Sequence, residues 1–93
     1  MTSQGEQTPA VVMYASGWCP YCMRARSLLE RLGIAYEEIR VDEEPAQREL
    51  MVARSGGLRT VPQIFVGEHH VGGFDELHAL ERAGELKKLL GSA

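Results

Sequence analysis

The sequence predicts a single α/β domain built on a small mixed sheet with helices packed against it. Two patterns support this: short apolar runs of strand length alternate with segments of helical periodicity, and glycine or proline stands at most of the junctions. A chain of 93 residues can bury one hydrophobic core and no second one. We expect residues 1–9, which are polar and contain Gly and Pro, to form a flexible tail and residues 10–93 to form the domain.

The first half of the chain predicts a strand, a helix and a second strand. An apolar run at residues 11–14 stops at Ser16 and Gly17, as a buried strand would. From Pro20 the apolar positions recur at helical spacing, and Gly33 follows as a C-terminal cap; these positions are Cys22, Ala25, Leu29 and Leu32. Residues 36–41 alternate, with Ile39 and Val41 on one side, which suits a strand parallel to the first.

The second half predicts a helix, a hairpin and a helical C-terminus. After Pro45 a modest apolar stripe, made of Ala46, Leu50 and Ala53, runs up to the break at residues 55–57. Residues 63–66 and 69–71 form two strands joined by a tight turn at Gly67-Glu68. The remainder is one broken helix or two short ones, interrupted at Gly84, with apolar positions Leu77, Leu80, Leu86, Leu89 and Leu90. This order of elements is that of the thioredoxin fold.

Composition and charge exclude several classes of partner. The net charge of −3 argues against binding to nucleic acid or to an anionic membrane surface. No apolar run approaches the roughly 20 residues that would span a bilayer. The first ten residues lack the basic start and apolar middle of a secretory signal. We therefore expect a cytoplasmic monomer with no membrane partner.

The two cysteines, Cys19 and Cys22, lie at the predicted turn from the first strand to the first helix. A Cys-x-x-Cys pair at such a turn is typical of a redox site, and a zinc site is the alternative. Zinc needs four ligands, and the further candidates are three histidines, His69, His70 and His78. The first two are neighbours on a strand and would point to opposite faces, so we favour the redox interpretation and expect no metal.

The predicted helix gives the two cysteines different roles. Cys19 falls at the N-cap, with Pro20 at the first helical position, so the amides of Tyr21 and Cys22 can point at its sulfur and favour a thiolate. Cys22 belongs to the buried stripe and should be less ionised. Cys19 is therefore the predicted nucleophile and Cys22 the resolving cysteine. Arg24 and Arg26 add positive potential in a stretch without acidic residues, and we assign neither a catalytic role.

Three motifs in order carry a family resemblance: Cys19-Pro20-Tyr21-Cys22, Thr60-Val61-Pro62 and Gly72-Gly73-Phe74-Asp75. Over residues 11–90 the chain resembles dithiol glutaredoxins, bacterial ones in particular. The resemblance implies a glutathione-dependent thiol–disulfide oxidoreductase that reduces protein disulfides and glutathione mixed disulfides. It implies glutathione as co-substrate, no tightly bound cofactor, and disulfide-containing or glutathionylated proteins as partners.

The resemblance also implies a glutathione-binding site. The Val61-Pro62 bond is expected to be cis, with the Val61 backbone pairing with the cysteinyl backbone of glutathione like an added strand. Gly73 allows close approach, and the helix opened by Phe74 and Asp75 can hold the γ-glutamyl group. The remaining assignments are Thr60 as part of the motif, Tyr21 flanking the tripeptide, and Arg59, assisted by Arg48, at the glycine carboxylate.

Two departures from the family pattern leave alternative functions open. Ser16 stands where glutaredoxins usually carry a lysine that binds the glycine carboxylate, and Trp18 is reminiscent of thioredoxins. Trp18 is either a packing residue or an aromatic contact for protein substrates. One alternative is therefore a thioredoxin-like reductant served by a flavoprotein reductase. Another is binding of an iron–sulfur cluster shared between two chains, against which Pro20 argues, because cluster-binding relatives usually have glycine or serine there.

Overall fold

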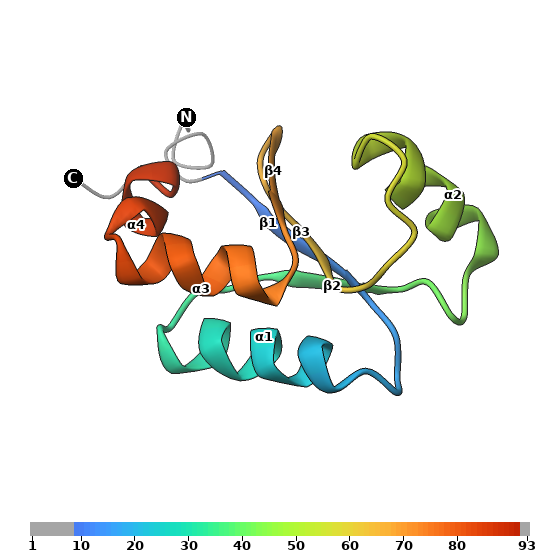
Figure 1. Cartoon of the computed structure of the whole chain (residues 1–93), viewed down its shortest axis with the longest axis horizontal. Helices are drawn as coiled ribbons and strands as arrows, with labels where there is room; N and C mark the ends of the chain where they lie inside the picture. Colours follow the sequence, from blue (N-terminus) through green and yellow to red (C-terminus); the bar gives the residue numbers. More distant parts are fainter. Residues whose placement is uncertain (1–8, 92–93) are drawn as a thin grey trace, which may run out of the picture.

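The computed structural model of the chain describes residues 9–91 and contains a four-stranded sheet (Figure 1). The strands are β1 (Val11–Ala15), β2 (Glu37–Arg40), β3 (Gln63–Val66) and β4 (His69–Gly72), in the spatial order β2-β1-β3-β4. β1 pairs with β2 in parallel and with β3 antiparallel, and β3 pairs antiparallel with β4. The predicted mixed sheet and thioredoxin-like fold are confirmed. The predicted tail lies outside the described residues, apart from Pro9.

Helices cover both faces of this sheet. The helices α1 (Pro20–Arg31), α3 (Phe74–Arg82) and α4 (Glu85–Leu89) share one core cluster with Val11, Met13 and Ala15 of β1. The helix α2 (Pro45–Arg54) packs on the opposite face, in a second cluster that contains Tyr14. Because successive side chains of a strand point to opposite faces, β1 contributes to both clusters and is buried on both sides.

The helix α1 begins and ends as the sequence predicts. Cys19 is its N-cap, Pro20 occupies the first turn, and Gly33 follows the C-cap with a φ of +73°, a conformation that favours glycine. The buried face consists of Cys22, Ala25, Leu28 and Leu29. Leu32, predicted to continue this stripe, is instead the C-cap residue and is 38% exposed, because the helical periodicity ends before it.

The apolar stripe predicted for α2 is wrong. Ala46, Leu50 and Ala53 are exposed, and the only fully buried residue of this helix is Met51, which packs with Tyr14 and Phe65. Two alanines are too short to reach those rings, whereas the long, flexible methionine side chain fills the space. The guanidinium of Arg54 lies over the Phe65 ring, 4.2 Å from its centre, and donates to the Tyr14 hydroxyl at 2.9 Å. Arg54 thus packs against the same pair of aromatic residues as Met51.

The predictions for the hairpin and the C-terminus hold. Gly67 starts the two-residue turn between β3 and β4 with a φ of +59°. Gly84, with a φ of +77°, separates α3 from α4, so the C-terminal region forms two short helices. Within residues 9–91, no helix has the length and apolar character needed to cross a bilayer.

Replacing Met51 by alanine should lower the free energy of unfolding by about 2–5 kcal/mol, because the side chain is fully buried between the two rings. The neighbouring change Leu50→Ala is the control and should cost less than about 0.5 kcal/mol, since Leu50 is 46% exposed. Urea denaturation of both variants measures the difference. Equal losses would contradict the burial described for α2.

Candidate active site

The cysteine pair lies where β1 hands over to α1. Cys19 is the N-cap residue in an extended conformation, and the backbone amide of Cys22 donates to its sulfur at 3.1 Å. This bond and the positive end of the helix dipole both favour negative charge on the Cys19 sulfur. Of the two amides that the sequence placed near this sulfur, that of Cys22 therefore forms the bond.

The two thiols, both unpaired, have different surroundings. Cys19 retains 9% exposure, whereas Cys22 is fully enclosed by the core of α1 and β1. Burial, together with its interaction with Cys19, raises the pKa of the Cys22 thiol to about 12; the backbone amide of Ser16 and the charge of Arg26 act in the opposite direction. At neutral pH Cys22 is thus a protonated thiol.

The positive charges on α1 are not all available to the cysteines. Arg26 forms a two-pronged pair with Glu38 of β2, with nitrogen–oxygen distances of 3.0 and 2.6 Å. Arg24 lies over the Tyr21 ring, 5.3 Å from its centre. The charge of Arg26 is therefore partly balanced by Glu38, although it still acts to lower the pKa of the Cys22 thiol. The sequence alone does not place Glu38 near Arg26. Glu38 alternates with Ile39 on the predicted strand, and no local sequence pattern identifies its partner on α1.

The loop before Cys19 is tied to the end of β2. The Gly17 amide donates to Asp42 Oδ2 at 3.2 Å, and Arg40 holds the same carboxylate through two hydrogen bonds of 2.9 and 2.8 Å. The Arg40 pair holds the pKa of Asp42 well below its usual range. A Cβ at position 17 would collide with the Arg40 guanidinium, so glycine permits this approach.

A groove with a volume of about 610 Å³ runs beside the cysteine turn. It brings together residues from all three sequence motifs: Tyr21, Thr60, Val61, Pro62, Gly73, Phe74 and Asp75. The Val61-Pro62 bond is cis, and the Cys19 thiol donates to the Val61 carbonyl at 3.6 Å. The groove thus passes next to the reactive sulfur.

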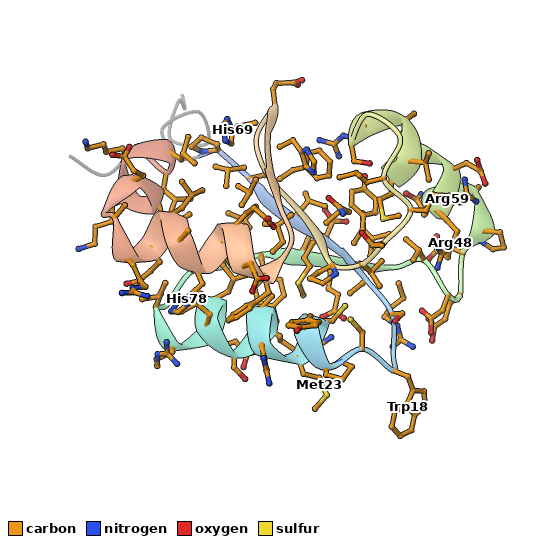
Figure 2. The ribbon with its side chains drawn as sticks, viewed as in Figure 1. Trp18, Met23, Arg48, Arg59, His69 and His78 are labelled. Carbon is orange, nitrogen blue, oxygen red and sulfur yellow. The ribbon has the colours of Figure 1, made fainter. Side chains whose placement is uncertain are left out.

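Arg59 and Arg48 lie beside this groove without lining it. The Arg59 side chain is 62% exposed and is 3.8 Å from Glu49, while its carbonyl accepts a hydrogen bond from Arg48 at 3.1 Å. Arg48 therefore supports the backbone of the loop that leads into Thr60. Figure 2 shows both arginines at the α2 end of the molecule.

The groove also contains residues that sequence reasoning missed, of which Gln63 and His70 are the most informative. Gln63 is 3% exposed; its amide nitrogen donates to the carbonyl and the hydroxyl of Thr60 at 3.1 and 3.3 Å. His70 stacks on Phe65 and lies 2.7 Å from the Gln63 oxygen. A glutamine in a strand that is otherwise apolar was the available signal, and these contacts orient Thr60 toward the groove.

A side chain of α3 itself accepts the hydrogen bond of the first backbone amide at the start of the helix. Glu76 accepts from the Gly73 amide at 2.8 Å, in the manner of a capping box. An anion at this helix start therefore meets the amides of Phe74 and Asp75, and not that of Gly73. Gly72 has a φ of +117°, and a Cβ there would press on Glu76 at 3.1 Å, so glycine is required on both grounds.

Trp18 extends away from the protein (Figure 2) and is 98% exposed, so the interpretation of it as a packing residue is wrong. With Tyr21 and Met23, which are 51% and 58% exposed, it surrounds the turn with apolar surface. His69 and His78 lie on the hairpin and on α3, apart from the cysteine turn. Within residues 9–91, no group of three or more His, Cys, Asp or Glu side chains is arranged to hold a metal ion.

Comparison with known proteins agrees with this geometry. The family model for glutaredoxin matches residues 11–71. A curated glutaredoxin of Pseudomonas aeruginosa is 55% identical over 84 residues, which cover 90% of this chain and 99% of the relative. Glutaredoxin 3 of Escherichia coli is 46% identical over 80 residues, covering 86% of this chain and 95% of the relative.

Solved structures give the same result. The solution structure of glutaredoxin from Brucella melitensis superposes with a TM-score of 0.79 at 45% identity and covers 92% of each chain. The crystal structure of a buckwheat glutaredoxin–glutathione complex superposes with a TM-score of 0.79 at 33% identity, covering 88% of this chain and 76% of the buckwheat chain. The chain thus shares its fold with these proteins and belongs to the glutaredoxin family.

Proposed function

We propose that this thiol–disulfide oxidoreductase uses Cys19 as its nucleophile and Cys22 as its resolving thiol, with glutathione as co-substrate. The contrast between the two sulfurs carries the proposal. Cys19 has an amide donor, a helix N-terminus and some exposure, whereas Cys22 is enclosed and its pKa is raised to about 12. Only the first sulfur combines nucleophilic character with access to a substrate disulfide.

The glutathione reaction needs Cys19 alone. Its thiolate attacks the glutathione sulfur of a protein–glutathione mixed disulfide, a bond forms between Cys19 and glutathione, and the protein leaves as a thiolate that takes up a proton. A second glutathione thiolate then attacks the glutathione sulfur bound to Cys19. Glutathione disulfide leaves, and the Cys19 thiolate is restored.

Protein disulfides require the second cysteine. Attack by the Cys19 thiolate on one sulfur of the protein disulfide breaks that disulfide, leaves a mixed disulfide between Cys19 and the protein, and releases the other protein sulfur as a thiolate that takes up a proton. The Cys22 sulfur then attacks the Cys19 sulfur. The Cys19–Cys22 bond forms, the protein leaves as a thiol with the proton that Cys22 loses, and two molecules of glutathione later reduce the bridge. Because the pKa of Cys22 is raised, this attack depends on proton transfer as the bond forms.

The groove beside Cys19 is the proposed glutathione site. The backbone of Val61 faces the reactive sulfur, which suits pairing with the cysteinyl part of the tripeptide. The start of α3 offers amides to the γ-glutamyl carboxylate, and Asp75 offers its carboxylate to the adjacent ammonium. Thr60, Pro62, Gly73 and Phe74 shape the groove, Tyr21 flanks it, and the exposed Arg59 side chain, next to Thr60 in the chain, is the proposed partner of the glycine carboxylate.

We further propose that the protein acts as a monomer in the cytoplasm, on disulfide-containing or glutathionylated proteins. A dithiol that works against the glutathione pool suits this reducing compartment. Turnover coupled to glutathione reductase, compared with turnover coupled to thioredoxin reductase, distinguishes glutathione dependence from the thioredoxin-like alternative. Activity with thioredoxin reductase alone would overturn the proposal.

The division of roles predicts unequal cysteine variants. Cys19→Ser should abolish reduction of glutathione mixed disulfides, because no other accessible thiol remains. Cys22→Ser should retain that activity and lose reduction of protein disulfides. Both activities are measured by NADPH consumption with glutathione reductase. Equal loss in the two variants would show that the roles are not divided.

The buried environment of Cys22 predicts its reactivity toward iodoacetamide. In the Cys19→Ser variant, alkylation at pH 8 should be much slower for the folded protein than for the urea-unfolded chain, because burial, the largest cause of the raised Cys22 pKa, is retained. The unfolded chain is the control and should level off near the ordinary cysteine pKa of 9.0. In the wild-type protein the unfolded Cys22 thiol ionises at lower pH than the folded one, so the stability contributed by this thiol should fall between about pH 9 and pH 12. Equal alkylation rates for the folded and the unfolded variant would contradict the enclosure.

The proposed role of Asp75 predicts a loss of glutathione affinity. Asp75→Asn should lower kcat/KM for glutathione about two- to fivefold, since an exposed ion pair contributes about 0.2–1 kcal/mol. The control is Glu68→Gln, which removes an exposed acidic charge from the distant hairpin turn. The two variants are compared at low ionic strength, where screening is weakest. An equal effect of both changes would assign the loss to overall charge.

A further inference from the structure

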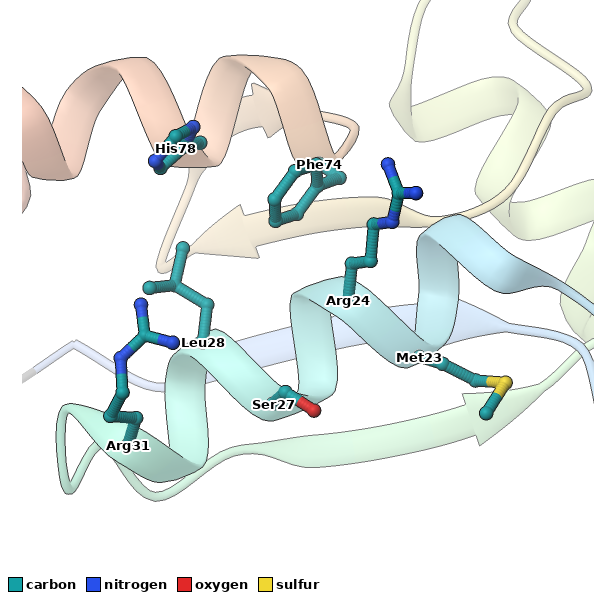
Figure 3. Close-up of a pocket in the computed structure, with 7 residues that line it drawn as sticks. All are labelled: Met23, Arg24, Ser27, Leu28, Arg31, Phe74 and His78. Atoms are coloured by element: carbon teal, nitrogen blue, oxygen red, sulfur yellow. The ribbon is translucent and has the colours of Figure 1, made fainter.

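A second cavity, the α1–α3 groove, lies between the exposed sides of these two helices (Figure 3). It has a volume of about 300 Å³ and is lined by Met23, Arg24, Ser27, Leu28, Arg31, Phe74 and His78. Phe74 also lines the proposed glutathione groove, and Arg24 lies over the Tyr21 ring. The α1–α3 groove therefore begins at the redox site and leads away from it along α1.

The α1–α3 groove carries positive charge. Arg24 and Arg31 are separated by two helical turns, about 10 Å along the axis, and both extend toward α3 (Figure 3). Across the described chain, residues 9–91, the ion pairs involve other basic residues, and neither of these two arginines takes part in one. The residues that line the groove include no acidic one among those described, although the protein carries a net charge of −3.

Between the two arginines the surface is apolar. Leu28 is 2% exposed and lies below the groove, and the rings of Phe74 and His78 stack at 5.5 Å with an angle of 14° between them. Such a site suits an extended peptide with a carboxylate at each end and a small or apolar side chain between them. In an extended strand, side chains on one face are two or four positions apart, about 7 or 13 Å, and these two spacings bracket the separation of the two flexible arginines.

We propose that the α1–α3 groove binds an acidic segment of the protein substrate, next to the cysteine whose disulfide Cys19 attacks. This proposal rests on the proposed function, because the position of the groove matters only if Cys19 is the reacting sulfur. Glutathione would occupy the groove beside Val61 and Pro62 on one side of the sulfur, which leaves the α1 side for the protein chain. Charge complementarity then selects acidic segments over neutral and basic ones.

The geometry sets where the acidic residues should lie. Arg24 is five residues from Cys19, about 7 Å along the axis, and Arg31 lies about 10 Å further. At about 3.3 Å per residue, and with both side chains on one face of the extended segment, the matching carboxylates are near the second position and at the fourth or sixth position from the substrate cysteine. The direction of the segment is tested with two peptides, one with aspartates after the cysteine and one with aspartates before it.

The test compares glutathione mixed disulfides of these peptides with matched peptides that carry asparagine. At low salt, kcat/KM should be about three- to tenfold higher for one of the two aspartate peptides, and 0.5 M salt should remove the preference. Arg31→Gln should reduce the preference and leave turnover of the asparagine peptide unchanged. Arg82→Gln is the matched control, because it removes an arginine from the last turn of α3 and should preserve the preference.

Two outcomes would overturn the proposal: equal kcat/KM for all peptides, or an equal effect of Arg31→Gln and Arg82→Gln, which would indicate overall charge. Binding of the aspartate peptide with serine in place of cysteine separates this proposal from the proposed function, because it needs no thiol chemistry. NMR shifts of the Ser27, Arg31 and His78 amides should accompany that binding. Shifts without any turnover of the disulfide peptides would contradict the proposed function alone, and turnover without shifts or preference would contradict the groove alone.

Discussion

The packing of α1 against β1 determines where both sulfurs lie. Ala25 and Leu29 are fully buried in the cluster that contains Met13, and Cys22 lies on the same helical face. Cys19 precedes Cys22 by three residues and therefore lies at the N-cap, at the boundary between the start of the helix and solvent. The position of α1 on the sheet therefore encloses the Cys22 thiol and leaves the Cys19 thiol partly exposed.

The surroundings of this helix are held by contacts that come from distant parts of the chain. Val61 reaches the Cys19 sulfur from the loop before β3, and Gln63 and His70 hold Thr60 from the hairpin. Glu76 accepts a hydrogen bond from the Gly73 amide at the start of α3. The proposed glutathione site is thus formed mainly by residues of the β3–β4 hairpin and the loop before it, whereas α1 positions the two sulfurs.

Most of the fold could be predicted from the sequence because its elements have local signals. The 3.6-residue period of α1, the alternation in β2 and the glycines at the turns each depend on neighbouring residues. The orientation of α2 could not be predicted, since Met51 is buried by the Tyr14 and Phe65 rings, which are remote in sequence. The end of the α1 stripe at Leu32 was likewise set by where the helix stops.

The site was predictable to the same degree. The three motifs identified the cysteines and eight of the groove residues, because each motif has its own local chemistry. The pairing of Arg26 with Glu38 and the contact between Gln63 and His70 depend on how the strands and helices are brought together. Single-sequence patterns do not encode such partners, and the partial balancing of the Arg26 charge was missed for this reason.

The ties to β2 have a consequence for the motions of the redox turn. Arg26 links α1 to Glu38, and Asp42 links the loop at Gly17 to the end of β2, which is an edge strand paired only with β1. Edge strands open more readily than central ones, and local opening spreads through the contacts that a segment shares. We therefore expect the Gly17 amide and the β2 amides to exchange with solvent together, through opening of this sheet edge and not through global unfolding.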